Sequence, residues 1–302
     1  MNYYDIVVVG AGTAGLTAAI YALRAGKTVL VTEGESFGGQ ITSSPRVENY
    51  PAIKRISGNE FADALVTQVL DLGADVELEK VISVEDGNNK KVVTEDNEYE
   101  CKAVIIATGA KHRHLGIERE EELEGSGISY CAVCDGAFYK NQNVAVVGGG
   151  DSALQSAIFL SAYCKNVTLI HRRDEFRAEK ALIDKANKTD NIVTILNSQI
   201  KELEGENELT GLKLISNEGI KSELLIDGLF VAVGQAPDNK AFENLVDIDS
   251  KGYVIADESC ETRTAGIFAA GDCRTKKIRQ LTTAAADGAV AALAACSYTD
   301  RM

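Results

Sequence analysis

The sequence is poor in the residues and segments that would point to several classes of protein. It has no tryptophan and only three prolines in 302 residues, so long disordered linkers are not expected. Its 31 lysines and arginines stand against 45 aspartates and glutamates, and the net charge of −14 disfavours nucleic acid and anionic membranes as partners. No apolar run approaches the roughly 18 residues of a membrane span, and no secretory signal opens the chain. We therefore expect a cytoplasmic protein of about two domains.

Cysteines are few and scattered, with one exception. Only Cys131 and Cys134 lie close together, and an odd total of seven does not make a framework of structural disulfides. The three histidines lack the spacing of a zinc site around this pair, so no metal is expected. The five other cysteines are expected to be small apolar core residues: Cys101, Cys164, Cys260, Cys273 and Cys296.

One pattern of strand, glycine loop, helix and strand occurs twice. Residues 6–32 comprise a β-branched strand, a glycine loop at 10–15, a helix that Gly26 ends, and a second strand. Residues 144–170 repeat this order, with a glycine loop at 148–153. Position n of the first copy recurs at n + 138, so the corresponding pairs are Gly10 and Gly148, Gly12 and Gly150, Gly15 and Ala153, and Glu33 and His171.

Each glycine loop has the spacing of a dinucleotide-binding turn. The first glycine permits the tight turn, and the second lets the backbone approach a pyrophosphate. The third small residue lets the helix pack closely on the strand, so that the helix N-terminus points at the phosphates. A single motif of this kind is weak, but two copies in register between strand and helix predict two bound dinucleotides.

The residue after the second strand distinguishes the two copies. Glu33 can accept hydrogen bonds from ribose hydroxyls, as in NAD or the adenosine half of FAD, and would repel a 2′-phosphate. The second copy has His171, Arg172 and Arg173 there, with Arg177 close behind, and guanidinium groups bind phosphate bidentately. A solvated surface cluster is the alternative reading of these arginines. We predict FAD in the first copy and NADPH in the second.

The remaining segments predict an α/β fold with two Rossmann-like, three-layer nucleotide-binding domains. A later strand that ends in glycine follows each copy, at 103–107 and at 229–233. Alternating stretches precede these strands, at 76–100 and 192–223, and their turn residues predict antiparallel meanders.

The C-terminal segment is too short to form a domain of its own, so it is expected to complete the first one. The second domain would then be inserted into the first. The predicted parts are residues 1–112 for the first part of the FAD domain, 113–242 for the NADPH and disulfide domain, and 243–302 for the second part of the FAD domain.

Cys131 and Cys134 form the candidate redox pair. Two intervening residues let the sulfurs meet across one turn, and the start of a helix would stabilise one thiolate. Asp135 follows directly and can act as general acid or base for the thiols. Half of a zinc site and a chance pair of core cysteines are the alternatives. The polar neighbours of the pair favour an exposed turn instead.

Taken together, these motifs make the chain resemble the low-molecular-weight thioredoxin reductases, in the class II pyridine nucleotide-disulfide oxidoreductase family. The resemblance covers nearly the whole length. It rests on GAGTAG at Gly10, GGQ at Gly38, VENYP at Val47, ATGA at Ala107, SYCAVCDG at Ser129, GGGDSA at Gly148, HRRDEFRA at His171, AAGDCR at Ala269 and IRQL at Ile278.

The resemblance implies a flow of electrons from NADPH through FAD to the Cys131–Cys134 disulfide and on to oxidised thioredoxin. It implies that Cys134 faces the flavin, that Cys131 attacks the substrate disulfide and that Asp135 supplies the proton. Asp272 would contact the ribitol, and the Gln280 and Leu281 amides the pyrimidine edge of the flavin. The family further implies a homodimer, and a domain rotation about crossings near residues 112 and 243.

The predicted cofactor-binding residues fall into two sets. The FAD set is Gly10, Ala11, Gly12, Thr13, Ala14, Gly15, Glu33, Gly34, Gly38, Gly39, Gln40, Asn49, Ala107, Thr108, Gly109, Gly271, Asp272, Arg279, Gln280 and Leu281. The NADPH set is Gly148, Gly150, Asp151, Ser152, Ala153, His171, Arg172, Arg173, Arg177 and Gly234.

Some positions depart from the family pattern, and two other functions stay open. Val133 stands where threonine is commoner, and Leu154-Gln155-Ser156 replaces a usual acidic pair, which puts the nicotinamide contacts in question. One alternative is a related flavin reductase with a ferredoxin donor, or with a glutaredoxin-like or peroxidase-linked acceptor. The other is a flavin-binding redox sensor without turnover.

Overall fold

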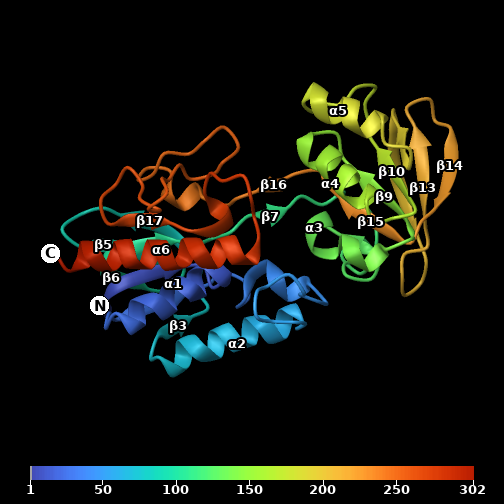
Figure 1. Cartoon of the computed structure of the whole chain (residues 1–302). Coiled ribbons are helices and arrows are strands. Elements are labelled where there is room, and N and C mark those ends of the chain that lie inside the picture. Colours follow the sequence, from blue (N-terminus) through green and yellow to red (C-terminus); the bar gives the residue numbers. More distant parts are fainter. Residues whose placement is uncertain (1) are drawn as a thin grey trace. The chain divides into compact units, whose positions relative to one another are not determined.

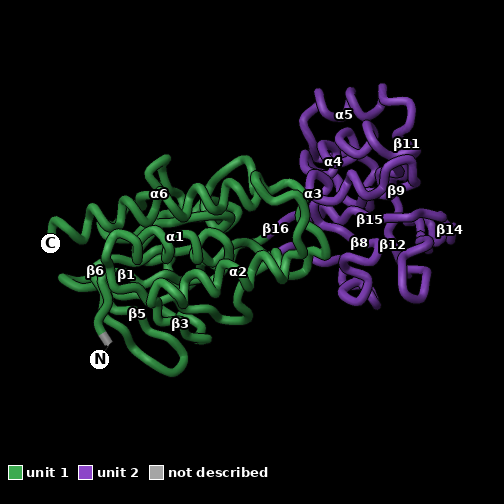
Figure 2. The backbone as a smooth tube through the Cα atoms, turned by 60° about the horizontal axis from the view of Figure 1, so that its bottom comes forward, with its two compact units in different colours: residues 1–111, 236–302 green, residues 112–235 purple. Residues whose placement is uncertain are grey.

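A computed structural model gives the fold of residues 2–302, which form two compact units (Figure 1, Figure 2). The first unit comprises the chain up to Lys111 together with Ala236–Met302, and the second comprises His112–Gln235. Short strands β7 (Lys111–His112) and β16 (Gln235–Ala236) pair with each other where the chain crosses. The second unit is therefore one continuous insertion into the first.

The first unit is built on a seven-stranded sheet of order β3-β2-β1-β6-β5-β4, with β17 beside β6. Strands β3, β2, β1, β6 and β17 pair in parallel, and β4, β5 and β6 form an antiparallel meander. The strands are β1 (Asn2–Val9), β2 (Val29–Thr32), β3 (Asp75–Glu77), β4 (Val81–Glu85), β5 (Lys90–Thr94), β6 (Glu98–Ile106) and β17 (Ile267–Ala269).

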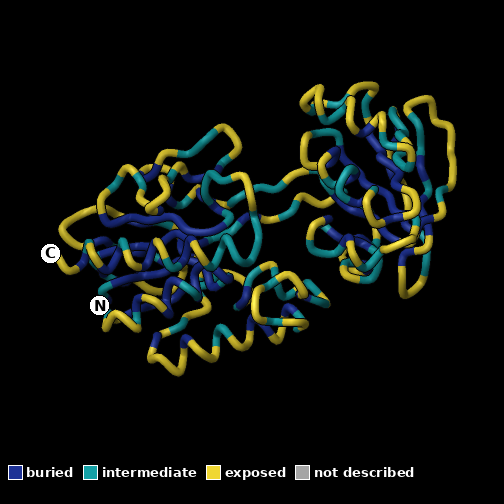
Figure 3. The backbone as a smooth tube through the Cα atoms, in the orientation of Figure 1, coloured by how far each residue is buried: buried dark blue, intermediate teal, exposed yellow. Residues whose placement is uncertain are grey.

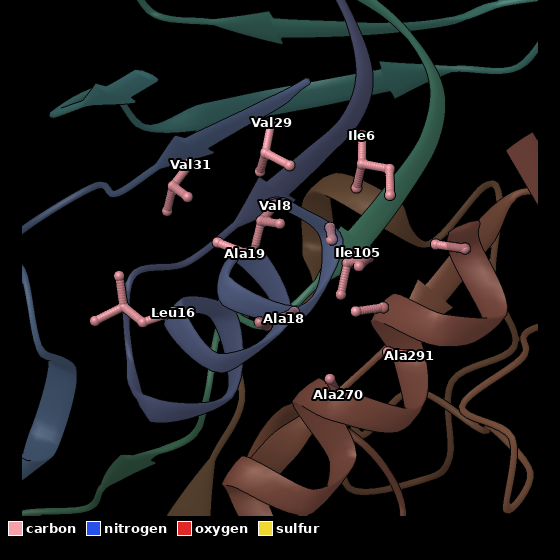
Figure 4. Packing of buried hydrophobic residues seen from close by; sticks show 14 of the residues in the cluster. Ile6, Val8, Leu16, Ala18, Ala19, Val29, Val31, Ile105, Ala270 and Ala291 are labelled. Carbon is pink, nitrogen blue, oxygen red and sulfur yellow. The ribbon is translucent and has the colours of Figure 1, made fainter. Parts of the chain in front are cut away.

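Helices α1 (Thr13–Arg24) and α6 (Leu281–Thr299) cover one face of this sheet, where Figure 4 shows Val8, Val31 and Ile105 directed toward them. The helices meet at backbone distance, because a Cβ at Gly288 would lie 2.2 Å from the Ala14 carbonyl oxygen. Three of the seven buried residues of α6 are alanines and one is Gly288, and these small residues permit this approach. Each buried valine or isoleucine contributes about 1.5–3 kcal/mol relative to exposure.

Shorter elements complete the first unit. Helix α2 begins with a capping box, in which Ser57 and Glu60 bond each other's backbone amides. The shorter elements of this unit are helix α2 (Gly58–Asp71) and the 3₁₀ turns η1 (Gly39–Ser43), η3 (Lys240–Phe242) and η4 (Gly271–Cys273).

The second unit repeats this plan with a parallel sheet of order β11-β10-β9-β15-β8 and a three-stranded antiparallel sheet, β12-β13-β14. In both units the central parallel strands are buried along most of their length, whereas the edge strands β3 and β11 are not (Figure 3). The strands are β8 (Ile128–Ser129), β9 (Asn143–Val147), β10 (Asn166–Ile170), β11 (Ile192–Ile195), β12 (Ser198–Glu204), β13 (Gly211–Ser216), β14 (Lys221–Leu225) and β15 (Gly228–Val231). The helices are α3 (Ala132–Asp135), α4 (Asp151–Ser161) and α5 (Lys180–Asn187), with the 3₁₀ turn η2 (Gly136–Tyr139).

The predicted fold class is confirmed, with one correction to the meanders. Residues 76–100 and 192–223 were expected to be wholly antiparallel, but β3 and β11 each add to the parallel sheet. Each follows a helix and completes a βαβ unit, and a short alternating stretch does not reveal which strand will pair with it. Among residues 2–302, no helix is long and apolar enough to cross a membrane.

Candidate functional site

The first glycine loop lies between β1 and α1, and its glycines serve two different purposes. A Cβ at Gly10 (φ +109°) would lie 2.3 Å from the Ala107 carbonyl oxygen, and one at Gly15 would lie 1.8 Å from the Gly10 oxygen. A Cβ at Gly12 would meet nothing closer than 3.9 Å. Gly10 and Gly15 therefore permit close packing, whereas Gly12 leaves an open strip of backbone where a phosphate can approach.

Other predicted FAD residues surround this loop. The Ala11 amide donates to Glu33 Oε2 at 2.8 Å, and the Gly38 amide donates to the Ala11 carbonyl oxygen at 2.8 Å. A Cβ at Gly39 would lie 3.2 Å from the Gly12 Cα. The structure thus brings the first loop, the end of β2 and the start of η1 together.

Residues from distant segments complete this region. Asn49 Nδ2 donates to Gln280 Oε1 at 3.3 Å, which joins the loop before α2 to the N-cap of α6. The Thr108 hydroxyl donates to Asn239 Oδ1 at 3.0 Å. Asn239, 2% exposed, in turn donates to the Cys273 carbonyl oxygen at 2.9 Å. Asn239 was missed by sequence reasoning, because it belongs to no motif and meets Thr108 and Cys273 only in the folded unit.

Asp272 gives the clearest sign that this region is built for a polar ligand. Its carboxylate is buried, and its Oδ1 has no hydrogen-bond partner within residues 2–302. Burial raises the pKa of Asp272, and the positive charges of Lys276 and Arg279 offset this only in part. A buried polar atom of this kind calls for an outside partner, and a ribitol hydroxyl would satisfy it. The residues present therefore fit FAD.

A cluster of charged side chains around Asp287 holds the turn next to Asp272. Asp287, on α6, accepts hydrogen bonds from the Gly271 amide (3.0 Å), Arg274 Nε (2.8 Å) and Lys276 Nζ (2.8 Å). Burial by itself would raise the pKa of Asp287, but the hydrogen bonds from Arg274 and Lys276 have the larger effect, so the net pKa is lowered. Sequence reasoning missed this cluster, whose carboxylate fixes the turn η4 that carries Asp272.

Two predicted FAD residues already have partners within the protein. The Arg279 guanidinium lies 4.2 Å from the Tyr253 ring centre and donates to the carbonyl oxygens of Asp272, Arg274 and Lys276. The Gln280 amide donates to Thr283 Oγ1 at 3.1 Å. Both residues hold the segment that leads into α6.

The second glycine loop, between β9 and α4, repeats the first. A Cβ at Gly148 would lie 2.4 Å from the Ala232 carbonyl oxygen and 2.7 Å from the Ala153 Cβ. At Gly150 a Cβ would meet nothing within 4 Å, so the backbone is open there as it is at Gly12. The same division between packing and open backbone is thus present at both copies.

The other residues around the second loop are arranged as follows. Asp151 Oδ1 accepts from the Glu179 amide at 2.8 Å, and the Gly234 carbonyl oxygen accepts from the Arg113 amide at 3.0 Å. Ser152 is exposed at the start of α4, whereas Leu154 is fully buried in the core. Leu154 is therefore a packing residue of α4.

His171 and the three arginines follow β10. His171 is 8% exposed and stacks on Phe176, and its ring fills the space where Gly149 has no Cβ. Its Nε2 has no hydrogen-bond partner within residues 2–302, and burial lowers its pKa. The side chains of Arg172, Arg173 and Arg177 form no hydrogen bond or ion pair within the same range.

Three unpaired arginines are unusual in a chain that carries a net charge of −14. With 45 carboxylates available, a solvated surface cluster would be expected to find partners among them. The arrangement leaves the guanidinium groups available to an external anion. The residues present therefore fit the 2′-phosphate of NADPH.

Cys131 and Cys134 form a disulfide with 5.3 Å between their Cα atoms, as predicted. The pair spans the short helix α3, where Cys131 is the N-cap and its Sγ accepts from the Cys134 amide at 3.2 Å. Val133 between them is 55% exposed, while both cysteines are half-buried. The pair is therefore accessible on one side, although it is less open than an exposed turn.

The other five cysteines are buried and unpaired, as expected of core residues. Burial raises the pKa of every one, to about 12 for Cys101 and Cys260 and to about 11 for Cys164 and Cys273. They are therefore inert thiols near neutral pH.

Two neighbours of the redox pair were not singled out from the sequence. The Ser129 hydroxyl, 5% exposed, donates to Asp135 Oδ2 at 2.6 Å and accepts from the Cys131 amide at 3.0 Å. Tyr130 donates to Glu120 Oε1 at 3.0 Å. Only the tertiary structure brings Glu120, which also binds two backbone amides, to this position.

The comparisons with known proteins agree with one another. A sequence model described as pyridine nucleotide-disulphide oxidoreductase matches residues 4–288. The chain is similar to a thioredoxin reductase of Listeria monocytogenes, 44% identical over 302 residues, which covers 99% of this chain and 95% of the relative. A thioredoxin reductase of Bacillus subtilis is 40% identical over 99% of this chain and 96% of the relative. The crystal structure of a thioredoxin reductase from Streptococcus pyogenes matches with a TM-score of 0.96 and 40% identity, over 99% of each chain.

Proposed function

Because the chain belongs to the pyridine nucleotide-disulphide oxidoreductase family, we propose that it is an NADPH-dependent thioredoxin reductase with FAD as its resident cofactor. The observation that carries this proposal is the Cys131–Cys134 disulfide, which lies in the same compact unit as an open glycine loop and unpaired arginines. The enzyme acts in the cytoplasm as a homodimer, and its substrate is the disulfide of a thioredoxin-like protein.

FAD belongs to the first unit in this proposal, which comprises the chain up to Lys111 together with Ala236–Met302. The open backbone at Gly12 receives the pyrophosphate, Glu33 receives the adenosine ribose, and Asp272 receives the ribitol. FAD held by these residues would supply the hydride-accepting and electron-transferring chemistry that the side chains lack. The protein's part is to hold these groups in place and to keep water out.

NADPH belongs to the inserted unit, His112–Gln235. The open backbone at Gly150 receives its pyrophosphate, and Arg172, Arg173 and Arg177 bind its 2′-phosphate. NADH has no such phosphate, so the arginines provide the preference for NADPH. Leu154 does not disturb this site, because its side chain lies in the core.

The reduced cysteines carry out two thiol–disulfide exchanges. The Cys131 thiolate attacks one sulfur of the partner's disulfide, forms a mixed disulfide and releases the partner's second sulfur as a thiolate. The Cys134 thiolate then attacks Cys131 Sγ, which restores the internal disulfide and releases the partner's first sulfur. Two protons leave the enzyme thiols and two protonate the partner's thiolates, so atoms and electrons balance.

Asp135 moves one of these protons. It directly follows Cys134, and the Ser129 hydroxyl holds its carboxylate at 2.6 Å. A carboxylic acid in this position can protonate the leaving thiolate of the partner, and the carboxylate can accept a proton from an enzyme thiol.

The test is anaerobic turnover. NADPH should bleach the yellow flavin, and oxidised thioredoxin should restore the colour over many cycles. Cys134→Ser should abolish thioredoxin reduction, whereas Cys296→Ala, at a buried cysteine outside the pair, should retain it. A flavin that NADPH fails to bleach, or normal turnover by Cys134→Ser, would refute the proposal.

A further inference from the structure

Ser129 lies at the centre of a hydrogen-bonded link between the redox pair and its acid. Its hydroxyl has one proton, and the distances to the two possible acceptors are 2.6 Å for Asp135 Oδ2 and 3.4 Å for the Cys131 carbonyl oxygen. The proton therefore points at Asp135, in the range of a charge-assisted bond. The lone pairs of the same oxygen accept from the Cys131 amide at 3.0 Å.

The serine itself is held rigidly. It is 5% exposed and ends strand β8, which pairs in parallel with β15 through Ser129 and Phe230. Asp135, by contrast, ends a helix of only four residues, which cannot fix a side chain by its own backbone order. The sheet thus supplies, through one hydroxyl, an orientation that the short helix cannot give.

From this geometry we infer that Ser129 is a positioning residue for the disulfide chemistry: it holds the Asp135 carboxyl group beside the cysteine pair so that Asp135 delivers a proton to the partner's leaving thiolate. This inference rests on the proposed function. Ser129 touches no reacting sulfur and acts only through Asp135.

A purely structural role makes a different prediction. If Ser129 only closed the turn before α3 through the Cys131 amide, its loss would disturb Cys131 itself and slow every reaction of that thiolate. If it acts through Asp135, its loss slows only those exchanges whose leaving group needs a proton. Two small disulfides separate these cases. Aromatic 5,5′-dithiobis(2-nitrobenzoate) leaves as a stable thiolate, whereas 2-hydroxyethyl disulfide leaves as an alkyl thiolate that must be protonated near neutral pH.

The experiment uses the full-length flavoprotein, reduced with dithiothreitol, desalted anaerobically and mixed with each disulfide. Ser129→Ala should slow the reaction with 2-hydroxyethyl disulfide by about tenfold or more, which is less than the roughly 10²–10⁴-fold of a complete loss of general acid catalysis, because Asp135 itself is still present. Its reaction with the aromatic disulfide should equal that of the wild type. Ser129→Thr, which keeps a hydroxyl, should restore the wild-type ratio of the two rates. Ser198→Ala, at another buried serine of this unit, is the matched control and should change neither rate.

Asp135→Asn completes a double-mutant cycle. Asp135→Asn should lower the alkyl rate in the same way, and adding Ser129→Ala to it should cost nothing more, because the two residues act as one unit. Equal slowing of both probes by Ser129→Ala, or a multiplicative loss in the double variant, would overturn the inference and leave the proposed function intact. A reduced wild type that reacts with neither probe would overturn both. If Ser129→Ala folds poorly, Ser129→Thr and Asp135→Asn are compared by the ratio of their rates with the alkyl and the aromatic disulfide. A ratio for Ser129→Thr as low as that for Asp135→Asn contradicts the inference.

Discussion

Removal of one arginine after β10 should change the preference between NADPH and NADH without weakening the fold. Arg172 and Arg177 are exposed and make no side-chain hydrogen bond or ion pair within residues 2–302, so Arg172→Ala or Arg177→Ala removes no internal contact. The unfolding free energy should therefore change by less than about 0.5 kcal/mol. The whole effect should fall on the 2′-phosphate of NADPH.

The magnitude follows from the contact that is lost. A hydrogen bond to a charged group contributes about 1.5–3 kcal/mol, and about 1.4 kcal/mol is a tenfold change in an equilibrium constant. Each substitution should therefore raise the KM for NADPH by roughly 10- to 150-fold. The KM for NADH should stay the same, because NADH has no phosphate for the arginine to bind.

The assay compares steady-state kinetics with NADPH and NADH at one ionic strength, using thioredoxin as acceptor. Lys165→Ala is the matched control, since it removes an exposed cation of the same unit at the surface turn before β10. Its KM for NADPH should match the wild type within error. If Arg177→Ala changed the KM for both nucleotides by the same factor, or for neither, the assignment of the arginines to the 2′-phosphate would be refuted.

Further substitutions test three structural supports of the sites: the Asp287 cluster, the second glycine loop and Glu120. Asp287→Asn should lower the unfolding free energy by about 3 kcal/mol and reduce the bound FAD, because it leaves the cations of Arg274 and Lys276 facing a neutral amide. Asp300→Asn, at the exposed end of the same helix, is the control and should cost less than about 1 kcal/mol in urea unfolding. The pKa of Asp287 is lowered in the folded protein, so its ionised carboxylate stabilises the fold above the ordinary pKa near 3.9. This stabilisation is lost as the pH falls through the folded pKa. The wild type and Asp287→Asn should therefore converge in unfolding free energy only below about pH 4. Gly150→Ala should keep the melting temperature and raise the KM for NADPH and NADH alike, whereas Gly148→Ala should unfold more easily, since its Cβ would meet a carbonyl oxygen at 2.4 Å. Glu120→Gln should cost about 1–3 kcal/mol in urea unfolding, because Glu120 is buried and one of the two amides it accepts from would then face an N–H donor. An unchanged midpoint would contradict this.

The features that the sequence revealed depend on local chemistry. Gly10 and Gly15 have their reasons within a few residues and one neighbouring strand, so their spacing alone predicts the turn and the packing. Cys131 and Cys134 are likewise paired by their separation along one turn. Repetition of the same pattern at n + 138 made the two-domain architecture predictable.

The features that the sequence did not reveal depend on contacts between distant segments. Asp287 meets its cations from a different element, and an aspartate in an alanine-rich helix has no local sign of this role. Asn49 and Gln280 are 231 residues apart and meet only in the folded unit. The parallel pairing of β3 and β11 was missed for a related reason, since an alternating stretch does not specify which strand lies beside it.

The central claim is that electrons from NADPH arrive at Cys131 and Cys134 and at no other cysteine. The direct measurement is native alkylation with iodoacetamide under anaerobic conditions, before and after NADPH, followed by mass spectrometry of the peptides. Before NADPH no cysteine should be labelled, because two form a disulfide and the other five are at most 6% exposed. After NADPH, Cys131 and Cys134 should become labelled while the five buried cysteines stay unmodified. A flavin that bleaches with no label at this pair, or label that appears first at another cysteine, would contradict the account.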